Sequence, residues 1–233
     1  MKKHPHLPIR WDGDALEMII ILALISLPDL LLSNYVSLPL ALQRSELVQV
    51  RAAVNLASAL EYLVPILLFI PMLVLWVIQR NRLSRQIGIV YLGWVTLRLV
   101  LKIGLIIFII VSRPQHTVGV LLKDSFILWI INFILFGTWY WMIDAGGPRA
   151  RRQGTTRRCD FVFPQQVVSL PGWEKWRPGF WDYIFLGFSS NTQFGMGDTQ
   201  VLSQRAKFLM ILQVTLSMSV IVFMASIAIS LMR

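Results

Sequence analysis

Residues 180–198 join an aromatic run, a polar run and a Gly-x-Gly-Asp turn, and a long apolar segment follows directly. Glycine permits alternating, partly left-handed backbone geometry, which lets successive carbonyl oxygens point at one axis. Rings of such carbonyls replace the water around a cation in an ion pathway. The polar residues 189–193 lie between apolar elements, so at membrane depth they need shelter in protein or contact with water. The candidate ion-coordinating residues are Thr192, Gln193, Phe194, Gly195, Met196, Gly197 and Asp198.

The segment from Phe180 to Asp198 resembles the pore of potassium channels, whose common form FxDALYFSxxTLTTVGYGD aligns with it without a gap. Thr192 and residues 194–198 fall on the Thr, Val, Gly, Tyr, Gly and Asp of TTVGYGD. The resemblance implies a short pore helix that dips partway into the bilayer, followed by a cation filter. Gln193 replaces the inner filter Thr and Met196 replaces the bracing Tyr, so selectivity for K⁺ does not follow. The residues expected to support the pore helix are Trp181, Asp182 and Tyr183.

The wider region from about residue 139 to 229 is similar to a family of poorly characterised bacterial inner-membrane proteins. Its members share an aromatic helix end, an Asp-Phe-x-Phe-Pro motif, a Phe-x-Asp-Tyr motif and a final apolar helix. The resemblance implies a multi-pass protein of the bacterial inner membrane. The matching elements here are Trp139-Tyr140-Trp141, Asp160-Phe161-Val162-Phe163-Pro164 and Phe180-Trp181-Asp182-Tyr183.

The composition indicates a membrane protein. The chain has 233 residues, of which 56% are hydrophobic, and its mean hydropathy is +0.64, values too apolar for a soluble domain of this size. The formal net charge is +10, but the basic residues cluster in short segments between apolar runs. We therefore expect them to face anionic lipid headgroups, not nucleic acid. One cysteine and three histidines predict neither a disulfide, a metal site nor a cofactor.

Five apolar stretches are long enough to cross the bilayer, which needs about 20 residues. The stretch over 181–188 is too short and predicts a re-entrant helix between the fourth and fifth spans. The predicted fold is thus an all-α integral membrane protein with three regions: a four-helix part (1–143), a basic loop (144–179), and the pore-like helix, filter loop and last span (180–233). The predicted spans are 16–32, 60–78, 87–111, 121–143 and 208–231.

Lys and Arg lie mainly before the first span, between the second and third, and after the fourth, which places the N-terminus in the cytoplasm. The basic N-terminal start superficially resembles a signal peptide, but acidic residues interrupt it, so we expect an uncleaved first span. With four spans before it, the Gly-x-Gly-Asp segment enters from the cytoplasmic face, whereas potassium channels insert theirs from outside. An inverted pore loop and a segment that does not conduct both satisfy this topology.

Arg98 and Lys102 stand four residues apart in the predicted third span and share one helix face. Charged groups at membrane depth are costly and mark functional candidates. Two cations at this spacing fall short of a voltage sensor. We expect them to pair inside the bundle with Asp29, Glu61 or Asp124.

Several function classes fit these patterns. A single filter loop cannot enclose an axis, so a channel for monovalent cations would need several copies, and the potassium-channel resemblance implies a homotetramer. A non-conducting membrane scaffold is the nearest alternative. Gly-x-Gly-Asp is also the signature of intramembrane aspartyl proteases, in which Asp198 would share a proton with Asp29, Asp124 or Asp144. None of these three has the expected Tyr-Asp context, so we predict that the chain is not an enzyme. A secondary transporter would need paired broken helices, and only one break is present.

Overall fold

The computed structural model describes residues 81–112, 118–154, 158–168, 171, 172, 174, 176–193 and 197–231, together with single positions between residues 63 and 74. The predicted span over 16–32 lies outside the described residues. So does the span over 60–78, apart from those single positions.

Three long helices form the body of the molecule: α4 (Asn81–Ser112), α5 (Val118–Ile143) and α9 (Gln204–Leu231). They coincide with the predicted spans over 87–111, 121–143 and 208–231. Three stretches are long and apolar enough to cross a membrane: Arg85–Gly104 in α4, Leu122–Gly146, which continues just past the end of α5, and Gln204–Ile229 in α9. The prediction of a largely helical protein with membrane-spanning segments is confirmed to this extent.

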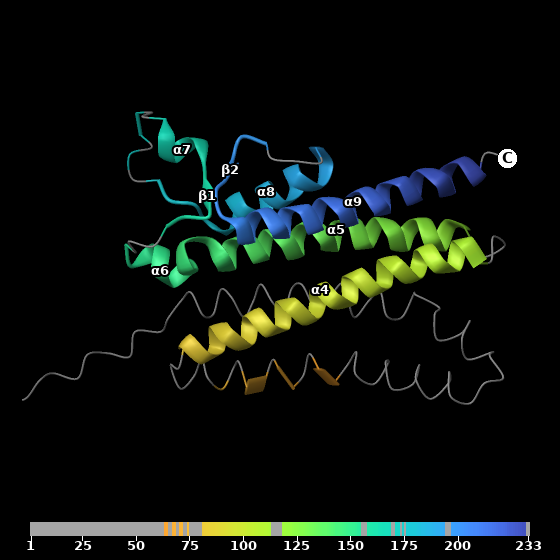
Figure 1. Cartoon of the computed structure of the whole chain (residues 1–233), viewed down its shortest axis with the longest axis horizontal. Coiled ribbons are helices and arrows are strands. Elements are labelled where there is room, and N and C mark those ends of the chain that lie inside the picture. Colours follow the sequence, from red (N-terminus) through yellow and green to blue (C-terminus); the bar gives the residue numbers. More distant parts are fainter. Residues whose placement is uncertain are drawn as a thin grey trace, which may run out of the picture.

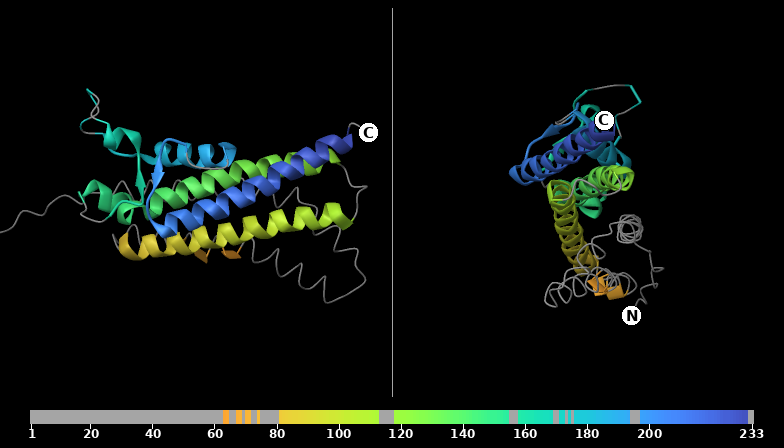
Figure 2. Two further views of the ribbon diagram at one scale, coloured as in Figure 1. Left: turned by 45° about the horizontal axis from the view of Figure 1, so that its top comes forward. Right: turned by 90° about the vertical axis from the view of Figure 1, so that its right-hand side faces the viewer.

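A shorter helix, α8 (Phe180–Gln193), packs on α5 and α9 on the side opposite α4 (Figures 1 and 2). α5 runs antiparallel to α4 and α9, and α8 runs in the same direction as α9. With 14 residues against the 28 of α9, α8 is about 21 Å long at 1.5 Å per residue. It starts at the end of the bundle where α5 stops, and the chain returns to that end before α9 begins.

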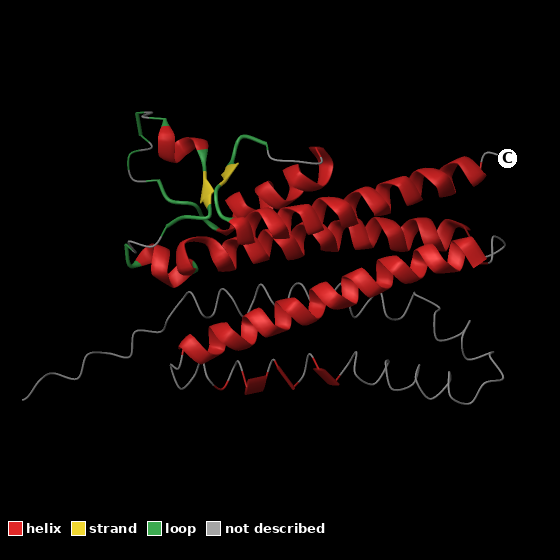
Figure 3. Cartoon of the chain, in the orientation of Figure 1, coloured by secondary structure: helices red, strands yellow, loops and turns green. Residues whose placement is uncertain are grey.

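Short elements gather at that end (Figure 3). They are η1 (Asp144–Gly146), α6 (Pro148–Arg152), β1 (Phe161–Val162), α7 (Pro164–Val167) and β2 (Gln200–Val201). β1 and β2 pair antiparallel, with Phe161 opposite Val201. This ladder is a small departure from the predicted all-α fold, and it joins the loop before α8 to the segment after it.

The chain leaves α5 through a sharp turn in left-handed backbone geometry. Ala145, Gly146 and Gly147 have φ values of 48°, 89° and 98°. Glycine adopts such values without the steric cost that a side chain brings. A Cβ on Gly147 would also lie 3.0 Å from the Arg85 guanidinium. The turn therefore reverses the chain directly at the end of α5 and brings the loop back over the bundle.

Two glycines bring α5 and α8 into backbone contact. A Cβ on Gly187 would lie 2.5 Å from the carbonyl oxygen of Phe133, and one on Gly137 would lie 2.9 Å from that of Tyr183. Small residues at a helix crossing are typical of membrane bundles, where close packing replaces the hydrophobic effect as the driving force. These contacts hold α8 at a fixed position along α5.

Candidate functional site

The predicted ion-coordinating residues begin inside α8. Thr192 is half-buried and Gln193 is exposed at the end of the helix, while Gly197 and Asp198 are exposed on the returning segment. A Cβ on Gly197 would lie 3.7 Å from Cβ of Ser189, so the chain passes back alongside α8. Phe194, Gly195 and Met196 lie outside the described residues.

The helix continues further than the sequence predicts. The predicted re-entrant helix covered residues 181–188, and the predicted ion filter began at Thr192, yet α8 runs to Gln193. The Thr192 hydroxyl donates to the carbonyl oxygens of Phe188 (3.0 Å) and Ser189 (3.2 Å), which satisfies it within the helix. The left-handed geometry expected of the glycines is not found at Gly197.

A buried polar network holds the last turns of α8 between α5 and α9. The Asn132 side chain donates to the Asn191 side-chain oxygen (2.8 Å) and to the Gln213 carbonyl (3.2 Å). Asn191 in turn donates to the Trp129 carbonyl (3.1 Å), and the Ser217 hydroxyl donates to the Asn191 carbonyl (2.7 Å). Each of these two amides thus finds a partner on a neighbouring helix, while Asn132 Oδ1 is buried without a hydrogen-bond partner among the described residues.

Gln213 extends this network toward the middle of α8. Its side-chain nitrogen donates to the Gly187 carbonyl (2.7 Å), and its side-chain oxygen accepts from the Tyr140 hydroxyl (2.5 Å). Gln213, Asn132 and Asn191 are all fully buried. Our sequence reasoning did not single out Asn132 or Gln213, although an amide inside an apolar span is a signal that could have found them.

The three residues expected to support a pore helix have different environments. The Asp182 carboxylate accepts from the Gly179 backbone N–H (2.7 Å) and so caps the start of α8. Tyr183 is fully buried, and its hydroxyl donates to Asp144 Oδ2 (2.5 Å). Trp181 is 79% exposed. Two of the three therefore anchor the first turn of α8, and Trp181 faces outward.

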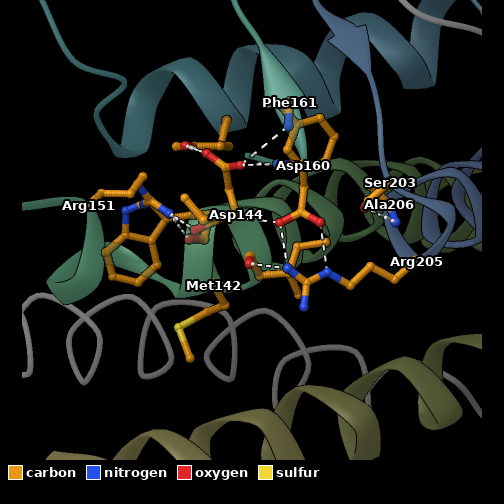
Figure 4. Close-up of polar contacts among 12 residues, drawn as sticks. Met142, Asp144, Arg151, Asp160, Phe161, Ser203, Arg205 and Ala206 are labelled. Carbon is orange, nitrogen blue, oxygen red and sulfur yellow. Dashed lines mark hydrogen bonds and ion pairs between the residues drawn. The ribbon is translucent and has the colours of Figure 1, made fainter. Parts of the chain in front are cut away.

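Two buried carboxylates organise the end of the bundle (Figure 4). Asp144 Oδ1 accepts from the backbone N–H groups of Asp160 (2.7 Å) and Phe161 (3.3 Å). Asp160 Oδ2 accepts from the backbone N–H of Ala145 (3.2 Å). The two residues thus bind each other's backbone, which ties β1 to the end of α5.

Asp160 also forms a bidentate pair with Arg205 at the start of α9. Arg205 donates through Nε to Oδ1 (2.7 Å) and through Nη2 to Oδ2 (2.6 Å). Burial alone would raise the pKa of Asp160, but hydrogen bonds from Arg205 and Ser203 and the nearby positive charge hold that pKa below its usual value. The carboxylate is therefore charged at neutral pH and links β1 to α9.

Arginines from three elements cap the carboxyl end of α5. Arg85 of α4 donates to the Met142 carbonyl (3.1 Å), and Arg205 of α9 donates to that of Ile143 (3.2 Å). Arg151 of α6 donates to the carbonyls of Trp141 (2.9 Å) and Asp144 (2.7 Å). The last carbonyls of a helix lack intrahelical partners and carry partial negative charge, so cations stabilise them.

Aromatic residues of β1 and the segment after it meet around Tyr183. Its ring packs edge-on against Phe161 (6.3 Å between centroids) and Phe163 (5.3 Å). The Arg151 guanidinium lies 4.9 Å from the centre of the Tyr183 ring, a cation–π contact. Trp141 packs edge-on against Phe180 at 5.6 Å. The motif residues thus form the contact between the bundle end and the start of α8.

The intramembrane cations lie on α4, where Arg98 is buried and Lys102 is half-buried. Of their predicted partners, Asp29 and Glu61 lie outside the described residues. Asp124 is buried on α5, and its Oδ1 has no hydrogen-bond partner among the residues that the structure describes. The predicted pairing of the two cations with a bundle carboxylate stays a prediction.

Asp144 and Asp198 do not form an aspartyl dyad in the structure. Both oxygens of Asp144 are bound, to Tyr183 and to two backbone N–H groups. Asp198 is exposed and shares no hydrogen bond with Asp144. In the described part of the chain, no cluster of three or more His, Cys, Asp or Glu side chains is placed to hold a metal ion.

No family model, curated protein or solved structure matches this chain.

Proposed function

We propose that the chain is a multi-pass protein of the bacterial inner membrane with five spans, a cytoplasmic N-terminus and a re-entrant loop formed by α8 and residues 192–198. In this proposal the loop lines part of a pathway for monovalent cations. The observation that carries it is the course of α8, which starts beside the end of α5, covers about half of the bundle, and is followed by a glycine-containing return to the same end.

The charge distribution at the tip of α8 favours a cation there. The carboxyl end of a helix carries partial negative charge, and the last turn of α8 contains no basic residue. The buried amides hold this end between α5 and α9. The tip is thus positioned before any ligand arrives, as a coordinating site requires.

Several copies would have to enclose the pathway. Gln193, Gly197 and Asp198 are exposed on one chain, and polar backbone at membrane depth needs protein or water around it. We propose a homotetramer, in which the return segments of four chains face a shared aqueous axis.

Cation flux into proteoliposomes tests the proposal, with K⁺ and Na⁺ measured separately because Gln193 and Met196 depart from the potassium-channel pattern. A Cβ on Gly197 would meet Gln193 Oε1 at 3.6 Å, an ordinary contact, so Gly197→Ala should fold normally. We expect Gly197→Ala and Gly195→Ala to abolish flux. Gly93→Ala on α4, where a Cβ meets nothing within 4 Å, is the matched control and should conduct.

Unchanged flux in both loop variants would refute the pathway. A non-conducting membrane scaffold is the second candidate, and the ordinary φ of Gly197 and the helical Thr192 favour it. Wild-type protein that stays monomeric in detergent and carries no flux after verified reconstitution would support the scaffold.

A further inference from the structure

Exposed arginines gather where α5 ends and α8 begins. Residues 144–179 contain seven Lys or Arg and three Asp or Glu. The structure divides the described arginines of this region by their environment. Arg151 is directed inward and caps α5. The exposed ones are Arg149, Arg152, Arg158 and Arg177.

Three of the exposed arginines meet at α6. Arg149 and Arg152 are three residues apart on this helix and therefore lie on neighbouring positions of its surface. Arg177 reaches them from the segment before α8, because its Nη1 donates to the backbone carbonyls of Arg151 (3.3 Å) and Arg152 (3.4 Å). We call Arg149, Arg152 and Arg177 the α6 corner.

Two carboxylates of this end are held inside the bundle. Asp144 and Asp160 are buried and bind Tyr183 and Arg205. Glu174 accepts from the Gly172 backbone N–H. Residues 144–179 carry seven Lys or Arg against three Asp or Glu, so the α6 corner lies in a basic stretch of the chain, and a phosphate bound there would form charge-assisted hydrogen bonds with the guanidinium groups.

An exposed tryptophan lies close to these arginines in the sequence. Trp181 follows Arg177 by four residues, lies on the first turn of α8 and is 79% exposed. Tryptophan is enriched at headgroup depth, and arginines at that depth attract anionic lipid. The α6 corner and Trp181 lie at one end of the three helices that are long and apolar enough to cross a membrane.

We propose that the α6 corner binds the phosphate of an anionic phospholipid, with Trp181 at the depth of its headgroup. The guanidinium group suits this ligand because its planar fork of donors matches two phosphate oxygens. The site is separate from the loop at residues 192–198 and does not depend on cation flux.

The test measures binding of phosphatidylglycerol to the full chain in detergent, read from the rise in the thermal unfolding midpoint. We expect wild type to rise by about 2–5 °C near saturation. Each surface cation contributes about a 5-fold change in affinity. The double variant Arg149→Gln/Arg152→Gln should therefore need about 25-fold more lipid for half of the rise. Lys123→Gln, an exposed cation at the opposite end of α5, should respond like wild type.

A charge-preserving variant separates binding from folding. Arg149→Lys/Arg152→Lys keeps the charge but loses the planar forks, so its half-saturating lipid concentration should lie between those of wild type and the Gln variant, even if the Gln variant unfolds at a lower temperature. The proposal would be overturned if the Gln variant needed no more lipid than wild type to reach half of the rise. An equal rise with phosphatidylcholine, whose headgroup carries a phosphate but no net charge, would overturn it too, because the site would then not select an anionic lipid. An equal rise with inorganic phosphate at the same concentration would also overturn it, because the site would then bind free anions.

Discussion

Substitution of Gly187 by alanine tests whether backbone contact with α5 holds α8 in place. The new Cβ would lie 2.5 Å from the Phe133 carbonyl oxygen and 3.0 Å from the Gly137 nitrogen. Both are backbone atoms, which have no rotamer to relieve the clash. Ordinary contact begins at 3.4 Å, so α8 must move away from α5 by about 0.9 Å.

That displacement also breaks hydrogen bonds. The bonds from Asn132 to Asn191 (2.8 Å) and from Asn191 to the Trp129 carbonyl (3.1 Å) cross the same interface, and a shift of about 0.9 Å takes both beyond about 3.2 Å. Overpacking costs about 1–3 kcal/mol, and each lost cross-helix bond about 0.6 kcal/mol. The better helix propensity of alanine offsets about 1 kcal/mol. The net loss of unfolding free energy is about 1–3 kcal/mol.

The single cysteine provides the assay. Cys159 is half-buried beside Asp160, so a thiol-reactive dye reports unfolding of the purified protein. We expect the midpoint of Gly187→Ala to fall by about 2–10 °C. Gly93→Ala, with open space around its Cβ, should unfold at the wild-type temperature or slightly above it. Equal midpoints for Gly187→Ala and Gly93→Ala would refute the close contact.

Two further predictions concern the carboxylates at the bundle end. Tyr183→Phe removes the hydroxyl that donates to Asp144. The buried carboxylate oxygen then has one donor fewer, which should lower the free energy of unfolding by about 1–3 kcal/mol. An unchanged unfolding midpoint in the dye assay would contradict this. The pKa of Asp160 is lowered in the folded state. The stability that its charged form gives the fold is therefore complete above the unfolded carboxyl's pKa of about 3.9, and it is lost as pH falls through the lower folded pKa. Wild type should thus lose stability below about pH 4, and Arg205→Gln should lose less over the same range; equal losses would show that the pair is not responsible.

Hydropathy was sufficient to predict the three long helices but not to predict where α8 ends. An apolar run long enough to cross a bilayer is a helix almost by necessity, because lipid offers no partner for backbone groups. The spans over 87–111, 121–143 and 208–231 were predicted on this ground. In α8 the apolar run predicted a helix over 181–188, yet the helix reaches Gln193. Asn191, beyond the predicted end, is bound by Asn132 and Ser217 on other helices, and a local pattern does not contain these contacts.

The contacts of the basic residues were also not predicted from the sequence. Their positions between the spans suggested lipid-facing anchors, and charge asymmetry alone treats every arginine alike. The structure assigns Arg85, Arg151 and Arg205 to the carbonyls at the end of α5. Which arginine faces inward depends on the left-handed turn at residues 145–147, which aims α6 and β1 back at the bundle. Sequence spacing does not encode that direction.

The position of α8 is set within one chain. Its buried polar side chains bind α5 and α9 of the same molecule, its first turn is tied to Asp144, and two glycines fix its height along α5. In the proposed assembly, neighbouring copies would therefore close around a return loop that each chain has already placed. Weakening subunit contact should then reduce flux without loosening α8, whereas Gly187→Ala should loosen α8 in the monomer as well.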